Sequence, residues 1–315
     1  MSDHATLRDA IVHFSSFANC KDFMVALRWS DGKVKCPTCG GEKVYWLEKR
    51  HMWKCPAGHP SPNFSLKTGT IFEDSPIALE KWLPAVWMLL NCKNGISSYE
   101  IHRGLGVTQK TAWFMMHRIR LATHCGSFEK RGGEGCEFEA DESYIGGKAR
   151  NMHADKRDAK RGIDNFGKTI VAAVLERGGT IRAKVVANRR KGELHRLVRE
   201  NVEPGSNLYT DALKSYEGLD EFTHQVIDHA EAYVKGNVHT NNCENFWSLL
   251  KRTIHGTYVS VEPFHLFRYV DEQAWRYNNR SMTDIQRFVF GMRHIIGRRV
   301  TYRQLTGKDG QVSHG

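Results

Sequence analysis

Three carboxylates in the second half of the chain have residue types and positions that suit a metal site. Asp141 lies in the alternating segment CEFEADESY, Asp211 ends the segment NLYTD, and Glu244 opens a helical pattern that begins near Asn242. Three converging carboxylates stay ionised together only when cations neutralise them, and hard oxygen ligands suit Mg²⁺ or Mn²⁺. Two such ions about 4 Å apart hold the attacking and leaving oxygens of a phosphodiester in line.

The helical pattern after Asn242 carries two further groups of interest. A helical wheel separates a packing face from an opposite face that holds Glu244, Trp247, Ser248 and Lys251. Lys251 follows Glu244 by about two turns, which is too far for an ordinary helix ion pair. We therefore expect Glu244 and Lys251 to contact one extended ligand such as a phosphodiester. Trp247 is expected either to stack on a splayed base or to pack as a core tryptophan.

Each carboxylate also has a purely structural interpretation. Asp141 shares its predicted strand face with Glu137 and Glu139, so it could simply belong to a polar face. Asp211 could cap a following helix. Glu244 could be the third helical residue of a capping box that starts at Asn241. The three together favour a site, because all three fall at the positions where strands and helices meet.

A second group of residues has the composition of a zinc site. Cys36-Pro-Thr-Cys39-Gly-Gly offers two thiolates from one tight turn, and Cys55-Pro-Ala-Gly-His59 offers a thiolate and an imidazole after a short hairpin. Zn²⁺ takes four such ligands in tetrahedral geometry, so the spacing predicts a zinc ribbon with one structural ion. The second pair has one more intervening residue than the first. The alternative is free thiols beside an incidental histidine.

The elements that must position the carboxylates follow from the hydrophobic pattern after residue 136. Strand patterns over 136–141, 169–175 and 180–187 precede a helix over 191–201, a strand ending at Asp211, a short helix, a strand over 223–229 and the helix near Asn242. This is the element order of an RNase H-like domain, with a mixed sheet and helices on its faces. Its first and fourth strands are neighbours, so Asp141 and Asp211 should meet and Glu244 should close the cluster.

The first half of the chain is mostly helical outside the predicted ribbon. Residues 5–29 have helical periodicity, and 76–125 contain a helix, a Gly104-Leu-Gly106 turn and a second helix capped by Thr108. This outline resembles a helix-turn-helix, whose second helix enters the major groove. Three residues of that helix would then point at DNA, namely Gln109, Lys110 and Trp113. Three others would lie near the DNA backbone, namely His117, Arg118 and Arg120. The alternative is an αα-hairpin with a basic surface.

Composition points to a polyanionic partner. The 315 residues include 46 Lys and Arg against 35 Asp and Glu, giving a formal net charge of +11, which favours nucleic acid. Residues 147–168 hold seven lysines or arginines and three aspartates. We expect them to form a mobile loop that becomes ordered on DNA, with Lys148 and Arg150 as contacts. Unevenly spaced cysteines, no apolar span and no signal-peptide core predict a cytoplasmic protein.

The predicted fold is multidomain α+β. Its expected parts are an N-terminal helical lead-in, a zinc ribbon, a helix-turn-helix-like region, a Gly-rich linker, the RNase H-like domain, and C-terminal helices with a tail. Their boundaries are, in that order, 1–30, 31–74, 75–125, 126–135, 136–260 and 261–315.

These motifs together resemble a known family, the DDE transposases of bacterial insertion sequences that carry an N-terminal zinc ribbon (the ISXO-type group). The similarity extends from about Phe17 to Asn279 and rests on CPTCGG, FSLKTGTIF, GISSYEIHRGLGVTQKTAWFMMHRIR, DESYIGGK, YTDALKSY, VHTNNCENFWSLLKRTIHGTY and YVDEQAWRYNNR. The resemblance implies that Asp141, Asp211 and Glu244 are the acidic triad and bind two Mg²⁺ or Mn²⁺ ions. It also implies that Lys251 holds a phosphate near the DNA end.

The reaction that the resemblance implies is phosphoryl transfer on DNA. Water cleaves a phosphodiester at the end of the element, and the freed 3′-hydroxyl attacks target DNA. Partners would be the terminal inverted repeats, target DNA and further copies of the chain, in a nucleoid-associated bacterial protein. Two other classes stay open: a zinc-ribbon DNA-binding regulator whose sheet is an inactive scaffold, and a structure-specific nuclease with the same metal site.

Overall fold

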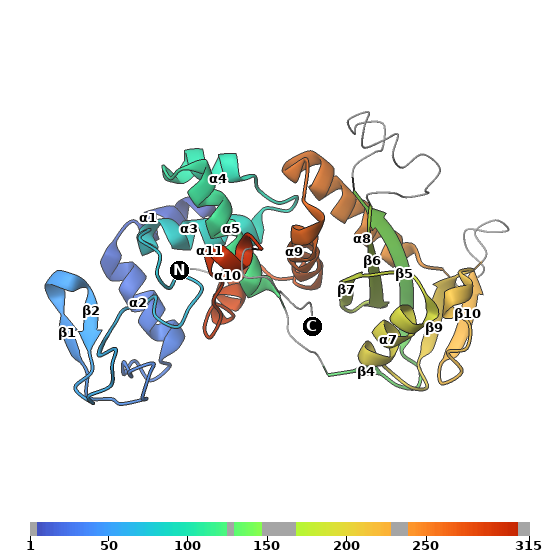
Figure 1. The fold of residues 1–315 in the computed structure, drawn as a ribbon, viewed down its shortest axis with the longest axis horizontal. Coiled ribbons are helices and arrows are strands. Elements are labelled where there is room, and N and C mark those ends of the chain that lie inside the picture. Colours follow the sequence, from blue (N-terminus) through green and yellow to red (C-terminus); the bar gives the residue numbers. More distant parts are fainter. Residues whose placement is uncertain (1–4, 125–128, 147–167, 228–238, 308–315) are drawn as a thin grey trace. The chain divides into compact units, whose positions relative to one another are not determined.

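The computed structural model describes residues 5–124, 129–146, 168–227 and 239–307. The chain divides into two units that are described separately (Figure 1). Unit 1 contains Met1–Thr123 together with Ser281–Gly315, and unit 2 contains His124–Arg280. Among the described residues, no helix has both the length and the apolar composition needed to cross a membrane.

Unit 1 combines a small antiparallel sheet with helices from both ends of the chain. The sheet has the order β1-β2-β3. Its strands are β1 Tyr45–Leu47, β2 Met52–Lys54 and β3 Asn63–Phe64, and its helices are α1 Leu7–Phe14, α2 Phe17–Arg28, α3 Leu79–Asn91, α4 Ser98–Leu105, α5 Gln109–Thr123, α10 Asp284–Arg293 and α11 Tyr302–Leu305. The helical pattern predicted for 5–29 is confirmed as α1 and α2.

The helical core of unit 1 is aromatic. The buried ring of Phe288 in α10 lies 5.7 Å from Phe14 in α1, 5.5 Å from Phe23 in α2 and 5.1 Å from Trp87 in α3, measured between ring centroids. Helix α10 therefore completes a core whose other members come from the start of the chain. The predicted part 261–315 is divided between the two units, because α9 belongs to unit 2 and α10 belongs to unit 1.

The predicted helix-turn-helix outline is present as α4 and α5. Ser97 caps α4 in a capping box with Glu100. Gly106 ends α4 with φ 59°, a left-handed conformation that glycine adopts without strain. The hydroxyl of Thr108 accepts a hydrogen bond from the Thr111 amide at 3.1 Å, so Thr108 caps α5 as predicted.

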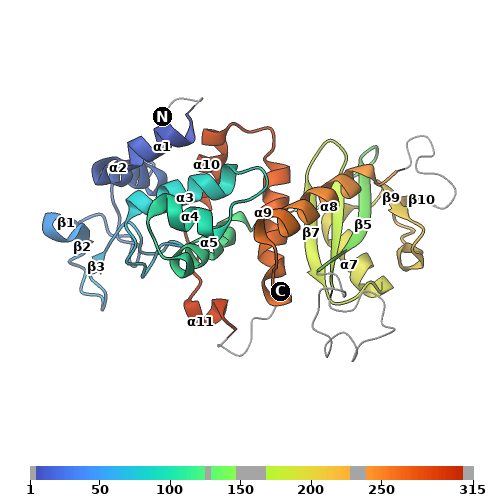
Figure 2. The ribbon, with the colours of Figure 1, turned by 90° about the horizontal axis from the view of Figure 1, so that it is seen from above.

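Unit 2 is a five-stranded mixed sheet between layers of helices (Figure 2). The strand order is β10-β9-β5-β6-β7, and β5 pairs with β9 in parallel and with β6 in antiparallel fashion. The strands are β5 Glu137–Ile145, β6 Thr169–Glu176, β7 Ile181–Val186, β9 Asn207–Asp211 and β10 Thr223–Ile227, and the helices are α7 Lys191–Asn201, α8 Asn241–Thr253 and α9 Leu266–Asn278. The predicted hairpin, the helix over 191–201 and the adjacency of the first and fourth strands are confirmed.

Each face of this sheet has its own hydrophobic core. One core contains Val171 and Ala173 of the sheet with Phe246 and Leu250 of α8 and Val270 of α9. The other contains Phe138 and Ala140 with Leu194 and Val198 of α7 and the buried Tyr216. Alternate residues of β6 therefore serve opposite cores, because Val171 and Ala173 belong to the first and Ala172 and Val174 to the second.

The predicted linker 126–135 is partly folded rather than a free connection. Strand β4, Arg131–Gly132, pairs in parallel with β8, Val202–Glu203. A side chain on Gly132 would approach the Ser206 hydroxyl to 2.4 Å, and the backbone there has φ 115°. Only glycine fits this close approach, so Gly132 permits packing instead of serving only as a linker residue.

Candidate functional site

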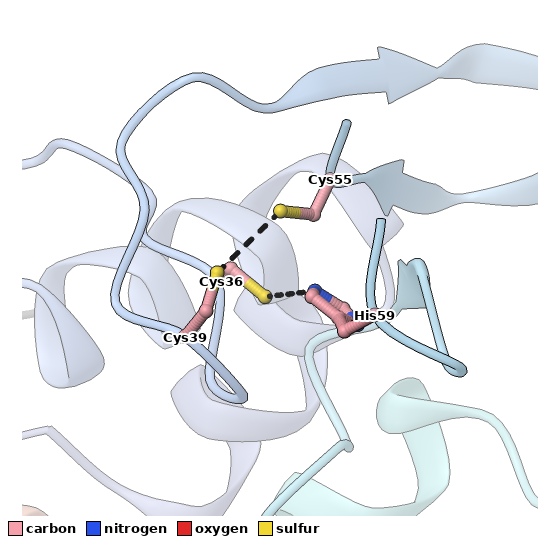
Figure 3. A group of neighbouring side chains, drawn as sticks. All are labelled: Cys36, Cys39, Cys55 and His59. Atoms are coloured by element: carbon pink, nitrogen blue, oxygen red, sulfur yellow. Dashed lines mark hydrogen bonds between the residues drawn. The ribbon is translucent and has the colours of Figure 1, made fainter. Parts of the chain in front are cut away.

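The zinc ligands predicted from spacing lie together in unit 1. The ligand atoms of Cys36, Cys39, Cys55 and His59 are all within 4.8 Å of one another. Cys36 Sγ lies 3.3 Å from His59 Nε2, and Cys39 Sγ lies 3.6 Å from Cys55 Sγ (Figure 3). Thiolates bound to one tetrahedral zinc ion are about 3.8 Å apart, so the four groups fit that ion.

Local backbone geometry produces this cluster. The Gly40 amide donates to the Cys36 carbonyl at 2.8 Å, and the Cys36 amide donates to the Gly41 carbonyl at 2.9 Å, which folds the first ligand pair into a tight turn. Burial opposes ionisation of Cys36, but backbone amides of Cys39 and Thr38 that donate to its sulfur lower the pKa of this thiol to about 6. A thiolate is the form that binds zinc.

The carboxylate site of unit 2 begins where β5 and β9 run side by side. Their parallel pairing includes Ala140 with Thr210, so Asp141 and Asp211 follow at the same level of the sheet. Carboxylate oxygens of Asp141, Glu142 and Asp211 all lie within 4.8 Å of one another. The structure therefore brings the two predicted aspartates together and adds Glu142, which the sequence analysis missed.

Neighbouring groups fix the orientation of these side chains. Asp141 Oδ2 accepts a hydrogen bond from Trp247 Nε1 at 2.9 Å, and Asp141 Oδ1 accepts one from the Glu142 amide at 2.8 Å. Asp211 Oδ1 accepts one from the Leu213 amide at 3.1 Å. The Tyr216 hydroxyl donates to Glu142 Oε2 at 3.1 Å. The short helix predicted after Asp211 is a single 3₁₀ turn over Lys214–Tyr216.

The electrostatics of this site favour the binding of a cation. Burial, and then the nearby charge of Asp211, raise the pKa of Asp141 to about 6, against the hydrogen bond from Trp247. Burial, and then Asp211 and Asp141, raise the pKa of Glu142 to about 7. A divalent cation among these groups would relieve both the desolvation and the repulsion. The donor set is oxygen only, which suits Mg²⁺ or Mn²⁺.

Glu244 lies on the exposed side of α8, outside the group of three but close enough for its charge to contribute to the raised pKa of Asp141. The capping-box interpretation of Glu244 is wrong. The N-cap of α8 is Thr240, without a side-chain cap, and the amides of Asn242 and Cys243 donate instead to Glu139 of β5. Lys251 is exposed on the same helix.

Two predicted DNA contacts are buried structural residues instead. Trp247 is only 4% exposed and packs in the core beneath α8, where its indole N–H donates a hydrogen bond to Asp141. Arg118 is 5% exposed, and its guanidinium donates to the carbonyls of Ile71 at 3.0 Å and Glu73 at 2.7 Å. Neither side chain has a free face for DNA. His117 and Arg120, expected near the DNA backbone, are also buried.

The other predicted contacts differ in accessibility. Lys110 is exposed near the start of α5, whereas Gln109 is half-buried and donates to the Ser98 hydroxyl at 2.9 Å. Trp113 is half-buried, with its ring 4.3 Å from that of His117. Lys148 and Arg150 lie outside the described residues, as does nearly all of the predicted loop 147–168.

Two known protein families match the parts of the chain that carry the carboxylates and the three cysteines. Residues 133–278 match the ISXO2-like transposase domain, and residues 16–57 match the transposase zinc-ribbon domain. The chain is 28% identical over 257 residues to a protein of transposable element ISH50 from Halobacterium salinarum, covering 76% of this chain and 83% of that protein. It is 35% identical over 100 residues to a transposase-like protein from Haemophilus influenzae, covering 31% of this chain and 80% of that protein. The chain belongs to the ISXO2-like insertion-sequence transposases with an N-terminal zinc ribbon.

Proposed function

We propose that this transposase cleaves DNA at the ends of an insertion sequence and joins the resulting 3′-hydroxyl to target DNA, using an RNase H-like catalytic domain in unit 2. The observation that carries the proposal is the convergence of Asp141 and Asp211 from strands that are distant in sequence and paired in parallel. A DNA-binding scaffold has no need of a half-buried carboxylate cluster in which two pKa values are raised, which argues against a regulator with an inactive sheet.

In this proposal Asp141, Asp211 and Glu244 hold the catalytic metal ions, and Glu142 is a fourth carboxylate beside them. Two Mg²⁺ or Mn²⁺ ions bound there would supply charge neutralisation for in-line displacement at phosphorus. Trp247 keeps the Asp141 carboxylate in a fixed orientation through its 2.9 Å hydrogen bond. Glu244 approaches from α8, and Lys251 on the exposed side of that helix holds a phosphate of the terminal nucleotides.

The zinc ribbon and the α4–α5 pair of unit 1 are proposed to bind DNA. In this arrangement zinc is structural, since four protein ligands leave no open position. Lys110 is the exposed cation of α5 that is best placed for a phosphate. We expect more than one copy of the chain to assemble on paired element ends, which light scattering with and without end DNA would measure.

The test compares carboxylate variants in an assay with a pre-nicked donor end. Asp211→Asn and Glu244→Gln should each reduce cleavage and strand transfer by orders of magnitude, while DNA affinity is unchanged or rises. Glu200→Gln is the matched control, because Glu200 is an exposed carboxylate on α7. Near-normal Mg²⁺-dependent cleavage by Glu244→Gln would remove Glu244 from the site. Cleavage without strand transfer by the wild-type protein would identify a nuclease instead.

A further inference from the structure

Glu139 is a fully buried carboxylate that the proposed catalytic chemistry does not use. It lies in β5 two residues before Asp141, on the same face of the strand, and is 0% exposed. Its Oε2 accepts hydrogen bonds from the amides of Asn242 at 3.0 Å and Cys243 at 3.1 Å, and its Oε1 accepts one from Asn242 Nδ2 at 2.8 Å. The first turn of α8, immediately before Glu244, is thus bonded directly to the strand that carries Asp141.

Arg177, directly after β6, completes this arrangement. Its Nε donates to Glu139 Oε1 at 2.9 Å, and its Nη2 donates to the carbonyl of His239 at 2.7 Å. One guanidinium therefore contacts both β5 and the residues that lead into α8. The planar fork of arginine reaches both acceptors at once, whereas the single ammonium of lysine lacks that geometry.

Strand β9, which carries Asp211, is also in contact with Arg177. The Arg177 guanidinium lies over the ring of Tyr209 at 4.0 Å from its centroid, and the Tyr209 hydroxyl donates to Glu137 Oε1 at 2.7 Å. Tyr209 precedes Asp211 by two residues in β9, so the two share a strand face. Each proposed metal ligand is therefore within two residues of a side chain or amide that contacts Glu139 or Arg177.

We propose that Glu139 and Arg177 are positioning residues that set the spacing of Asp141, Asp211 and Glu244 before metal binds. The inference rests on the proposed function of these three carboxylates. Burying an ion pair contributes little net stability compared with apolar packing. The contacts of Glu139 and Arg177 connect β5 to α8 and, through Tyr209, to β9. These three elements carry the three proposed metal ligands, which must keep a fixed spacing. Supporting residues of this kind typically change metal affinity or activity by about 10- to 100-fold when mutated.

The test uses Glu139→Gln and Arg177→Lys in the full chain, with Arg182→Met as the matched control. Arg182 is a half-buried arginine of β7 whose guanidinium donates to Asn201 Oδ1 at 2.9 Å and to the Glu129 carbonyl at 2.8 Å. The control removes a comparable arginine of unit 2 without touching α8 or β9. All variants are compared below their measured unfolding temperatures, so that only folded protein contributes.

Three readouts separate positioning from general stability. Hydrogen exchange in peptides that cover Asn242 and Cys243 should accelerate in Glu139→Gln, while exchange in β6 and β7 stays at the wild-type rate. Mn²⁺ affinity, measured with the metal alone by electron paramagnetic resonance, should fall by about 10-fold or more in both variants. Single-turnover cleavage should fall by a similar factor with unchanged DNA affinity. Arg182→Met should lower the unfolding temperature and leave all three readouts unchanged.

Wild-type Mn²⁺ affinity and cleavage in both Glu139→Gln and Arg177→Lys would overturn the inference. Asp141→Asn, measured in parallel, distinguishes this result from a failure of the proposed function. If Asp141→Asn is inactive while the two variants are active, only the positioning role fails. If Asp141→Asn cleaves normally, the catalytic assignment fails. In that case hydrogen exchange in the α8 peptides, together with Mn²⁺ affinity, decides whether Glu139 and Arg177 position the carboxylates.

Discussion

The carboxylate cluster should make the Mg²⁺-free protein less stable as the pH rises. Asp141 and Glu142 have pKa values raised to about 6 and about 7, above ordinary values of 3.8 and 4.5. The folded protein therefore holds these protons more tightly than the unfolded chain does. The resulting stabilisation is fully present below the ordinary pKa values and is lost as the pH rises through 6 and 7.

The size of the effect follows from the shifts. One pKa unit corresponds to about 1.4 kcal/mol, so a shift of about two units is worth on the order of 3 kcal/mol. The two carboxyls titrate as a coupled pair, so their contributions do not simply add. We expect unit 2 to lose on the order of 3 kcal/mol of its free energy of unfolding between pH 4.5 and pH 8 in Mg²⁺-free buffer. Added Mn²⁺ should restore most of this loss at pH 8.

The assay is urea unfolding, monitored by hydrogen exchange in peptides from β5. These peptides report on unit 2 separately from the zinc ribbon. Burial lowers the pKa of His195 and His224, so these histidines add stability as the pH rises and oppose the carboxyl effect. For this reason the deciding quantity is the difference between the wild-type protein and Glu142→Gln. The amide keeps an acceptor for the Tyr216 hydroxyl but removes one charge.

Glu142→Gln should be more stable than wild type at pH 8 without Mg²⁺, and the two proteins should converge near pH 4.5. Identical pH dependence of the two unfolding free energies, with no response to Mn²⁺, would refute the reasoning. It would mean that the carboxylates are too well solvated to repel one another and do not form one metal site.

Three further predictions concern other parts of the molecule. Cys55→Ser should release about one zinc per chain and unfold the ribbon, because structural zinc contributes folding free energy directly, and metal analysis with circular dichroism would show it; full zinc content would contradict the ligand assignment. Trp247→Phe should keep most of the packing but remove the bond to Asp141, so single-turnover cleavage should fall by about 10-fold or more with unchanged DNA affinity; unchanged cleavage would show that this bond is dispensable. Arg118→Met should cost about 1–3 kcal/mol of stability without weakening DNA binding by the folded protein. Lys110→Ala should weaken DNA binding and reduce its dependence on salt concentration. If titrations at two salt concentrations show weaker DNA binding for Arg118→Met and not for Lys110→Ala, Arg118 is a DNA contact after all.

The pairing of Asp141 with Asp211 could be predicted because it depends on element order, which hydrophobic periodicity records well. Glu142 could not be predicted by the same reasoning. Alternation assigns it to the face opposite Asp141, but pairing with β9 stops at Ala140 and Thr210. Beyond that point no strand among the described residues pairs with β5 on that side, so residues of both faces approach the same space. The adjacent acidic residues in DESY were the available signal.

Arg118 was predicted wrongly for a different physical reason, and for Trp247 the alternative of a core tryptophan holds. A charged or amphipathic residue on a helix is usually solvated, and the sequence contains no local sign that Arg118 bonds to carbonyls of Ile71 and Glu73. Those acceptors lie in and just after FSLKTGTIF, a segment recognised from its family resemblance but without a periodic pattern of its own. Trp247 lies on the polar side of the helical wheel, yet its long side chain reaches the half-buried Asp141.

The division of unit 1 between the two ends of the chain has a consequence for how the protein is made. Helices α1, α2 and α3 leave the ribosome first, but the Phe288 ring that packs against Phe14, Phe23 and Trp87 is synthesised only after all of unit 2. Domains generally fold as their sequences emerge. Unit 2 can therefore fold while unit 1 still exposes part of its aromatic core. A chain that terminates prematurely after α9 would carry every proposed catalytic carboxylate but could not close that core.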